Sequence, residues 1–126
     1  MRVLLVDDEV DLASALAERL DLRGIEADWV TTAEAALEKA SAVKYDLAVL
    51  DVKMPKVGGL ELRERLRRLY PQMKFIFLTG YGSEIEFKKA SCQEGESCYL
   101  VKPADIGDLI QRMKDLLAHG DGGGDQ

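Results

Sequence analysis

Four short apolar runs in this chain each end at a polar residue that is capable of chemistry. The runs cover residues 3–6, 47–50, 75–78 and 99–101. They are rich in Val, Leu, Ile and Phe without polar alternation, which is typical of strands buried on both faces of a parallel sheet. Because parallel strands end at one edge of their sheet, we expect the polar residues that follow the runs to lie close together. These residues are Asp7, Asp8, Asp51, Thr79 and Lys102.

Segments with apolar residues at helical spacing lie between the runs. We expect a further strand over about residues 26–30. We also expect five helices: one over about 12–23, one that starts at 31, one from 58 or 59 to 70, one over 83–93 and one over 105–118. Thr31 and Glu34 have the spacing of a capping box at the start of the second helix. Five strands that alternate with five helices favour a doubly wound parallel α/β sheet.

The third predicted helix mixes leucines, which we expect to face the core, with arginines, which we expect to point largely outward. The leucines are Leu60, Leu62, Leu66 and Leu69, and the arginines are Arg63, Arg65, Arg67 and Arg68. Glu61 and Glu64 interleave with the arginines, which favours a solvated face over a nucleic-acid-binding one.

Length and charge limit the classes of protein to consider. A chain of 126 residues fits one domain, expected over 1–118, with the Gly-rich residues 119–126 as a flexible tail or linker. The net charge of −6 argues against direct nucleic-acid binding. No apolar stretch approaches the roughly 20 residues that cross a bilayer, and no signal peptide is evident, so we expect a cytoplasmic protein without membrane contact.

Asp7 and Asp8 form an acidic pair directly after the first apolar run. Two adjacent like charges are costly unless a positive group lies beside them. A divalent cation such as Mg²⁺ meets that need, with Asp8 and Asp51 as ligands and Asp7 acting through water. The alternative is that one of the pair caps the helix that begins near Val10.

Asp51 is the candidate nucleophile of this edge. Because Pro55 follows four residues later, Asp51 is not expected to cap a helix, and its carboxylate is free to attack phosphorus. Lys102, which Pro103 follows, would supply a second positive charge, and the Thr79 hydroxyl would bond a phosphoryl oxygen. The alternatives are a snorkelling surface lysine and an ordinary strand-end threonine.

Four motifs, in order and at family-like spacing, resemble the receiver domain of two-component response regulators over about residues 1–118. They are Val6-Asp7-Asp8-Glu9; Asp51-Val52-Lys53-Met54-Pro55 with Gly59-Leu60 beyond; Leu78-Thr79-Gly80; and Tyr99-Leu100-Val101-Lys102-Pro103. The resemblance implies a flavodoxin-like fold with strand order 2-1-3-4-5.

The resemblance also implies a phosphorelay site. Asp51 would accept a phosphoryl group from a sensor histidine kinase or a phosphotransfer protein. Asp8, Asp51 and the backbone carbonyl of Lys53 would bind Mg²⁺, assisted by Asp7, and Lys102 would contact the phosphoryl group. The domain would then be a phosphoacceptor regulator, limited to Mg²⁺-dependent self-phosphorylation from phosphodonors and autodephosphorylation.

Further residues are implied to act after transfer. Thr79 would move toward the phosphoryl group, and Tyr99 would change rotamer, which alters the face that binds an output domain or target protein. Lys53 and Tyr81 would flank the path of the water that hydrolyses the phosphorylated Asp51. We hypothesise that Tyr81 shields the acyl phosphate, whereas Lys53 either tunes its lifetime or extends into solvent.

Two other functions are weighed against the switch. The first is a receiver-like interaction module that works without phosphorylation, which the intact set of site residues disfavours. The second is an enzyme, for which the chain lacks both an Asp-x-Asp signature at Asp51 and a Gly-rich phosphate loop after the first strand. The output partner is unknown. A homodimer through the last two helices is common in the family, but the charges of these helices are more simply explained by solvation.

Overall fold

The computed structural model describes residues 1–54, 56–79, 97–102 and 104–120, with only the backbone described at 79, 97–99, 101, 119 and 120. The strands are β1 (Arg2–Val6), β2 (Glu26–Val30), β3 (Leu47–Asp51), β4 (Lys74–Thr79) and β5 (Ser97–Val101). The helices are α1 (Val10–Leu22), α2 (Ala33–Ala42), α3 (Gly59–Leu69) and α5 (Ile106–Gly120).

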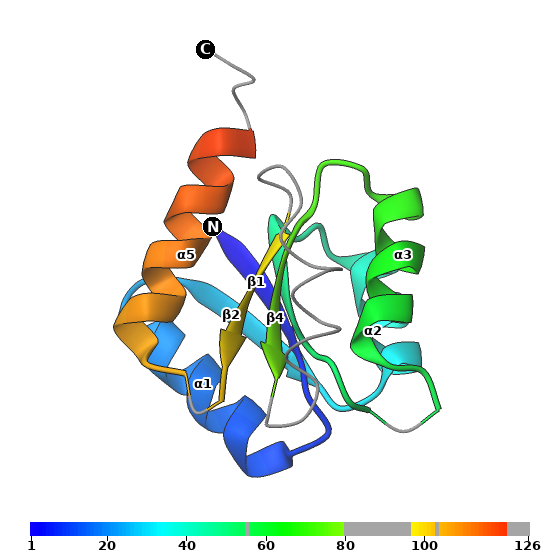
Figure 1. The fold of residues 1–126 in the computed structure, drawn as a ribbon, viewed down its shortest axis with the longest axis horizontal. Coiled ribbons are helices and arrows are strands. Elements are labelled where there is room, and N and C mark those ends of the chain that lie inside the picture. Colours follow the sequence, from blue (N-terminus) through cyan, green and yellow to red (C-terminus); the bar gives the residue numbers. More distant parts are fainter. Residues whose placement is uncertain (55, 80–96, 103, 121–126) are drawn as a thin grey trace.

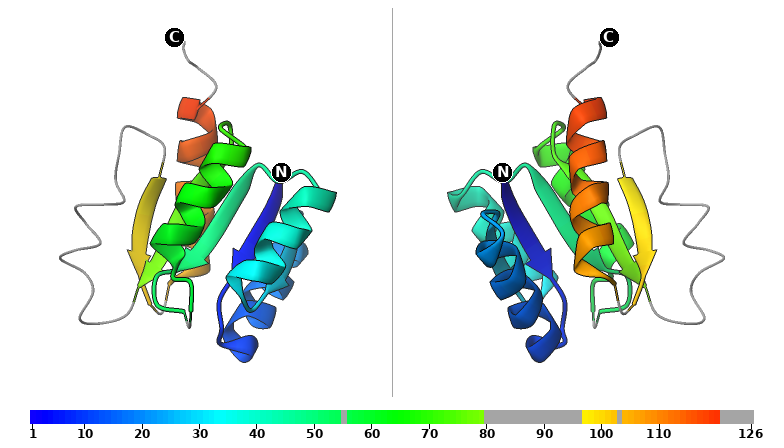
Figure 2. Two further views of the ribbon diagram at one scale, coloured as in Figure 1. Left: turned by 90° about the vertical axis from the view of Figure 1, so that its right-hand side faces the viewer. Right: turned by 90° about the vertical axis from the view of Figure 1, so that its left-hand side faces the viewer.

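The strands form one parallel sheet in the order β2-β1-β3-β4-β5, the order that the resemblance implied. Helices α1 and α5 cover one face, and α2 and α3 cover the other (Figures 1 and 2). The predicted parallel α/β class is therefore confirmed. The helix predicted over 83–93 lies outside the described residues and stays a prediction.

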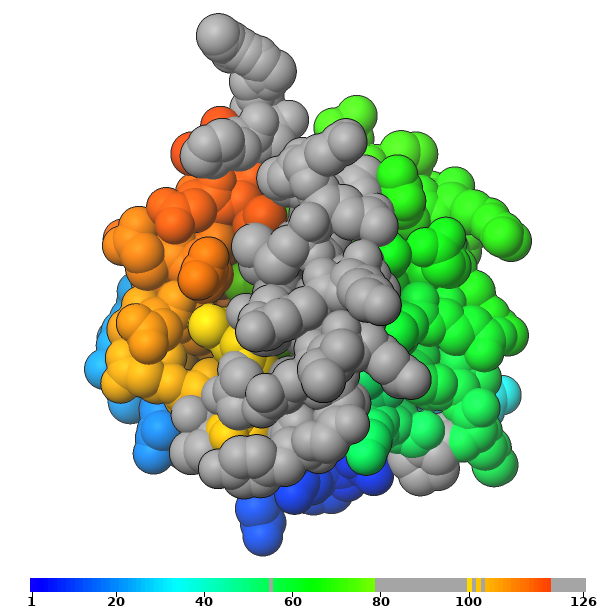
Figure 3. Space-filling view, viewed as in Figure 1, coloured from blue at the N-terminus to red at the C-terminus, as the bar shows by residue number. Residues whose placement is uncertain are grey.

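Each face of the sheet has its own apolar core, which explains why the strands lack alternation. Alternate strand residues such as Leu4 and Phe77 pack with α2 and α3, whereas Val3 and Ile76 pack with α1 and α5. A strand between two helical layers buries both of its faces, so every position favours an apolar side chain. In Figure 3, the surfaces of α3 and α5 lie on opposite sides of the face shown.

The start of α2 differs from the predicted capping box by one residue. Thr32 is the N-cap, and its hydroxyl oxygen accepts a hydrogen bond from the backbone N–H of Ala35 at 3.0 Å. The third helical position is therefore Ala35, and Glu34 is not in the position that returns a bond to the cap. The helix itself was predicted correctly, but Thr31 lies outside it.

The prediction for α3 was wrong at two side chains. Arg63 is only 5% exposed, and its guanidinium lies 5.9 Å from the ring centre of Phe77. Leu69 is 60% exposed. The buried stripe of α3 runs through Gly59, Leu62, Arg63 and Leu66, an i, i+3, i+4, i+7 pattern that includes Arg63. Leu69 is the final helical residue and lies beyond this stripe.

The last helix is longer than predicted, since α5 continues to Gly120 and includes two residues that had been assigned to the tail. Asp105 lies directly before it and accepts a hydrogen bond from the Asp108 N–H at 3.1 Å. In the described part of the chain, no helix combines the length and apolar character that crossing a bilayer requires.

Candidate functional site

The sheet order brings four sequence-distant strand ends to one edge. Residue pairing aligns Val6 with Leu50 and Asp51 with Leu78, while Thr79 pairs with Val101. Asp7 and Asp8 directly follow β1, Asp51 ends β3, and Lys102 directly follows β5. The polar residues after the four apolar runs thus lie on neighbouring strands, as predicted.

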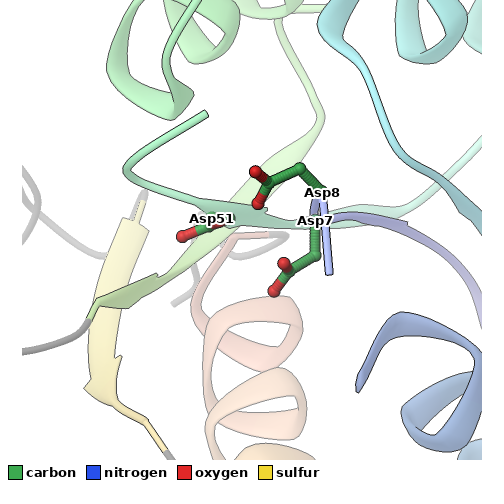
Figure 4. Close-up of side chains that lie close together, drawn as sticks. All are labelled: Asp7, Asp8 and Asp51. Atoms are coloured by element: carbon green, nitrogen blue, oxygen red, sulfur yellow. The ribbon is translucent and has the colours of Figure 1, made fainter. Parts of the chain in front are cut away.

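Three carboxylates converge at this edge. Asp7, Asp8 and Asp51 each offer an oxygen, and these oxygens lie within 4.8 Å of one another. Asp7 and Asp51 are buried, at 2% and 5% exposed, whereas Asp8 is exposed. Figure 4 shows the Asp7 and Asp8 carboxylates diverging from adjacent positions, both on the side on which Asp51 lies. The cluster is accessible to solvent through Asp8.

Lys102 places an ammonium group among these acids. Its Nζ lies 3.0 Å from Asp7 Oδ2 and 3.4 Å from Asp51 Oδ1, and it donates a hydrogen bond to Glu9 Oε1 at 2.9 Å. The side chain is 18% exposed. The snorkelling alternative is therefore wrong, because the ammonium is directed into the acidic cluster.

Backbone N–H groups hold the two buried carboxylates in place. Asp7 Oδ1 accepts a bond from Glu9 N–H at 2.9 Å, and Asp51 Oδ1 accepts a longer one from Lys53 N–H at 3.4 Å. The N-cap of α1 is Glu9, without a side-chain cap bond, and that of α3 is Gly58. None of the three aspartates is itself an N-cap residue, although Asp7 accepts the N–H of Glu9 at the start of α1.

The environment of Asp51 disfavours its charged form. Burial and the neighbouring Asp7 carboxylate raise the pKa of Asp51 to about 7, and a hydrogen bond with Asp8 adds to the rise, although the Lys102 ammonium opposes it. One ammonium does not compensate three clustered carboxylates. An added positive charge, from a proton or a bound cation, would relieve this repulsion.

The pKa of Lys102 is shifted in the opposite sense to that expected from burial alone. Burial lowers the pKa of this ammonium. The bonds to Glu9 and Asp7 and the charge of Asp51 raise the pKa by more than burial lowers it, so the net shift is upward. Lys102 is therefore a fixed positive charge at neutral pH.

The acidic cluster suits a divalent cation. It offers oxygen ligands from the segment after β1 and from the end of β3, together with an exposed carboxylate that a hydrated ion can reach. Burial and the Asp7 carboxylate both raise the pKa of Asp51, so a bound cation would favour its ionised form. These residues could therefore hold a metal ion.

The other predicted site residues are only partly described. Thr79 ends β4 and Tyr99 lies within β5, opposite Phe77, but neither side chain is described. Tyr81 lies outside the described residues. Lys53 is exposed, two residues beyond Asp51. The roles of these four residues remain predictions.

Sequence reasoning missed the hydrogen bond between Glu9 and Lys102. Glu9 was quoted only as part of a motif, although it is the third acid in a run of three and Lys102 directly follows another of the apolar runs. A count of charges at the predicted strand ends could have indicated the pair.

Comparison with known proteins establishes the family. The model of the response regulator receiver domain matches residues 3–114. The chain belongs to this family. Response regulators are components of two-component signalling. The recognition made from the four sequence motifs is confirmed.

Named relatives of this receiver domain include transcription regulators. The domain is 34% identical over 120 residues to the transcriptional activator protein IrlR of Burkholderia pseudomallei, covering 95% of this chain and 52% of IrlR. It is 32% identical over 120 residues to the response regulator GacA of Pseudomonas viridiflava, covering 94% and 56%. The chain thus spans about half the length of these relatives.

Solved receiver structures agree in fold. A CheY-like response regulator receiver domain protein from Methanospirillum hungatei has a TM-score of 0.84 and 32% identity, over 98% of both chains. The response regulator TrrA from Thermotoga maritima, solved in complex with Mg²⁺-BeF, has a TM-score of 0.78 and 32% identity, over 91% of this chain and 97% of TrrA.

Proposed function

We propose that this receiver domain is a phosphorylation-controlled switch in a two-component phosphorelay, with Asp51 as the phosphoacceptor. The observation that carries the proposal is the placement of Asp51. Its carboxylate lies at the end of β3, next to two further aspartates and 3.4 Å from the Lys102 ammonium. A carboxylate beside a fixed positive charge is suited to attack phosphorus.

The proposed transfer forms one bond and breaks one. A carboxylate oxygen of Asp51 attacks the phosphorus of a phosphohistidine on a sensor histidine kinase or a phosphotransfer protein. The P–N bond breaks, and its electron pair stays on the histidine nitrogen. The product is an acyl phosphate on Asp51, whose negative oxygens Lys102 is positioned to contact.

We assign Mg²⁺ to the acidic cluster, held by Asp8, Asp51 and the backbone carbonyl of Lys53, with Asp7 acting through water. The relative TrrA was solved with Mg²⁺-BeF, which supports this choice of ion. When bound, the ion would neutralise negative charge on the transferred phosphoryl oxygens. Asp7 also holds Lys102, through the 3.0 Å contact between Oδ2 and Nζ.

The proposed switch lies on β4 and β5. Thr79 would move toward the phosphoryl group and Tyr99 would change rotamer, which shifts the population between two packings of the output face. Lys53 and Tyr81 would set the lifetime of the acyl phosphate.

The relatives' names suggest a transcription-regulating output, although this domain itself would not contact nucleic acid. We place the protein in the cytoplasm, with a homodimer as one possible output state.

Incubation with acetyl phosphate and Mg²⁺, followed by intact-mass measurement, tests the proposal. The wild-type protein is expected to gain one phosphoryl group, whereas Asp51→Ala and a wild-type sample with excess EDTA are not. Asp46→Ala, which removes a carboxylate from the opposite end of β3, is the control and should be labelled like the wild type. If the wild-type protein gains no adduct, an interaction module that works without phosphorylation becomes the better description.

A further inference from the structure

Glu9 and the acidic cluster compete for the same ammonium group. Lys102 Nζ lies 2.9 Å from Glu9 Oε1 and 3.0 Å from Asp7 Oδ2, but 3.4 Å from Asp51 Oδ1. The contact between Lys102 and Asp51, which phosphoryl transfer would use, is therefore the longest of the three. The shortest is made by Glu9, which lies outside the acidic cluster.

Burial distinguishes the partners of Lys102. The Asp7 and Asp51 side chains are 3% and 7% exposed, and backbone N–H groups fix both. Glu9 is 62% exposed and makes no side-chain cap bond to α1. Among the described contacts, Glu9 is thus the partner that can leave most easily, since water can solvate its carboxylate.

We propose that Glu9 is a positioning residue that holds the Lys102 ammonium at the rim of the acidic cluster and thereby slows phosphorylation of Asp51. The inference rests on the function proposed above. As the phosphoryl group approaches Asp51, Lys102 exchanges its bond to Glu9 for a bond to a phosphoryl oxygen. The Glu9 bond stabilises the ground state but not the transition state, and therefore raises the barrier.

Two variants separate direct contact from remote repulsion. Glu9→Ala removes both the negative charge and the bond to Lys102. Glu9→Asp keeps a negative charge on residue 9. Its side chain is shorter by one methylene group, which withdraws the carboxylate from Lys102 Nζ. If Glu9 acted only by repelling anionic phosphodonors, Glu9→Asp would behave as the wild type.

The experiment measures the rate at which the full chain is phosphorylated by acetyl phosphate in the presence of Mg²⁺. In this reaction Asp51 attacks phosphorus, the P–O bond to the acetyl group breaks, and acetate leaves with the electron pair. Both Glu9→Ala and Glu9→Asp are expected to react about fivefold faster than wild type, the rate equivalent of a partly exposed ion pair. Glu18→Ala, an exposed acid on α1, is the control and should keep the wild-type rate.

The other outcomes overturn the inference in distinguishable ways. Acceleration by Glu9→Ala alone would mean remote repulsion, and unchanged or slower rates in both variants would mean that Glu9 does not restrain Lys102. A lower urea midpoint without a faster reaction would mean a merely structural role at the start of α1. If wild-type protein forms no adduct, the proposed function fails and the inference fails with it.

Discussion

Gly59, the first residue of α3, packs directly against the backbone of Asp51. A Cβ atom at Gly59 would overlap the carbonyl group of Asp51 and lie 3.1 Å from the Cα of Val52. The Gly59 N–H also donates a hydrogen bond to the Val52 carbonyl at 3.0 Å. The absence of a side chain at Gly59 therefore allows α3 to begin against the end of β3, where the candidate phosphoacceptor lies.

Replacement of Gly59 should damage both stability and the site. We expect Gly59→Ala to lower the free energy of unfolding by about 2 kcal/mol, because the obstructing atoms are backbone and yield little. The shifted Asp51 should also be phosphorylated more slowly. Urea unfolding measures the first effect. Gly107→Ala is the control, since its Cβ meets only the flexible Asp105 carboxylate, and equal losses in both variants would contradict the account.

The raised pKa of Asp51 predicts a specific pH dependence of stability. Folded Asp51 keeps its proton to about pH 7, whereas in the unfolded chain this carboxyl group titrates near pH 4. Its stabilising contribution is therefore complete below about pH 4 and is lost as the pH rises through 7. Asp51→Asn, which cannot ionise, should gain stability relative to wild type over this window.

Urea unfolding in EDTA at several pH values checks this difference. The advantage of Asp51→Asn should increase between about pH 4 and pH 7 and stay constant above that range. Asp11→Asn, at an exposed position in the first turn of α1, serves as the comparison. An advantage that does not vary with pH would show that repulsion in the acidic cluster is not its cause.

Arg63 and Arg65 lie two positions apart on α3 and should differ strongly in their effect on stability. Arg63 is buried, with its guanidinium near the Phe77 ring, and Arg63→Ala should cost about 2 kcal/mol through lost packing and cation–π contact. Arg65 is exposed and pairs with Glu61 at 2.7 Å, so Arg65→Ala should cost under about 0.5 kcal/mol. Comparable losses in thermal or urea unfolding would contradict the burial of Arg63.

The two threonines before α2 provide a similar test of the observed cap. Thr32→Ala removes the acceptor for the Ala35 N–H and should cost about 1 kcal/mol in the free energy of unfolding. Thr31→Ala leaves that bond intact and should cost clearly less. Chemical denaturation of the two single variants measures both losses. A larger loss of unfolding free energy in Thr31→Ala would favour the capping box predicted from the sequence.

The strands and the acidic site could be predicted because each depends on local sequence. Runs such as Val3–Val6 are apolar throughout and are followed directly by polar residues, so a shared parallel sheet places Asp7 and Asp51 at the same edge. The strand order came from resemblance, because the apolar runs themselves do not say which strands are neighbours.

Side-chain environments were harder to predict. An arginine such as Arg63 has an apolar stem and a charged tip, so its burial depends on a neighbouring strand that helical periodicity does not describe. The bond between Glu9 and Lys102 joins residues 93 positions apart, and its geometry depends on the sheet order. The choice of Thr32 over Thr31 depends on where the chain leaves β2.

The identity of the modified residue tests the central claim most directly. Wild-type protein is incubated with acetyl phosphate and Mg²⁺, treated with borohydride, which reduces an aspartyl phosphate to homoserine, and analysed by peptide mass spectrometry. The account predicts homoserine at position 51 alone, dependent on both phosphodonor and Mg²⁺. Homoserine at another aspartate, or its absence despite intact fold, would contradict the claim that Asp51 is the phosphoacceptor.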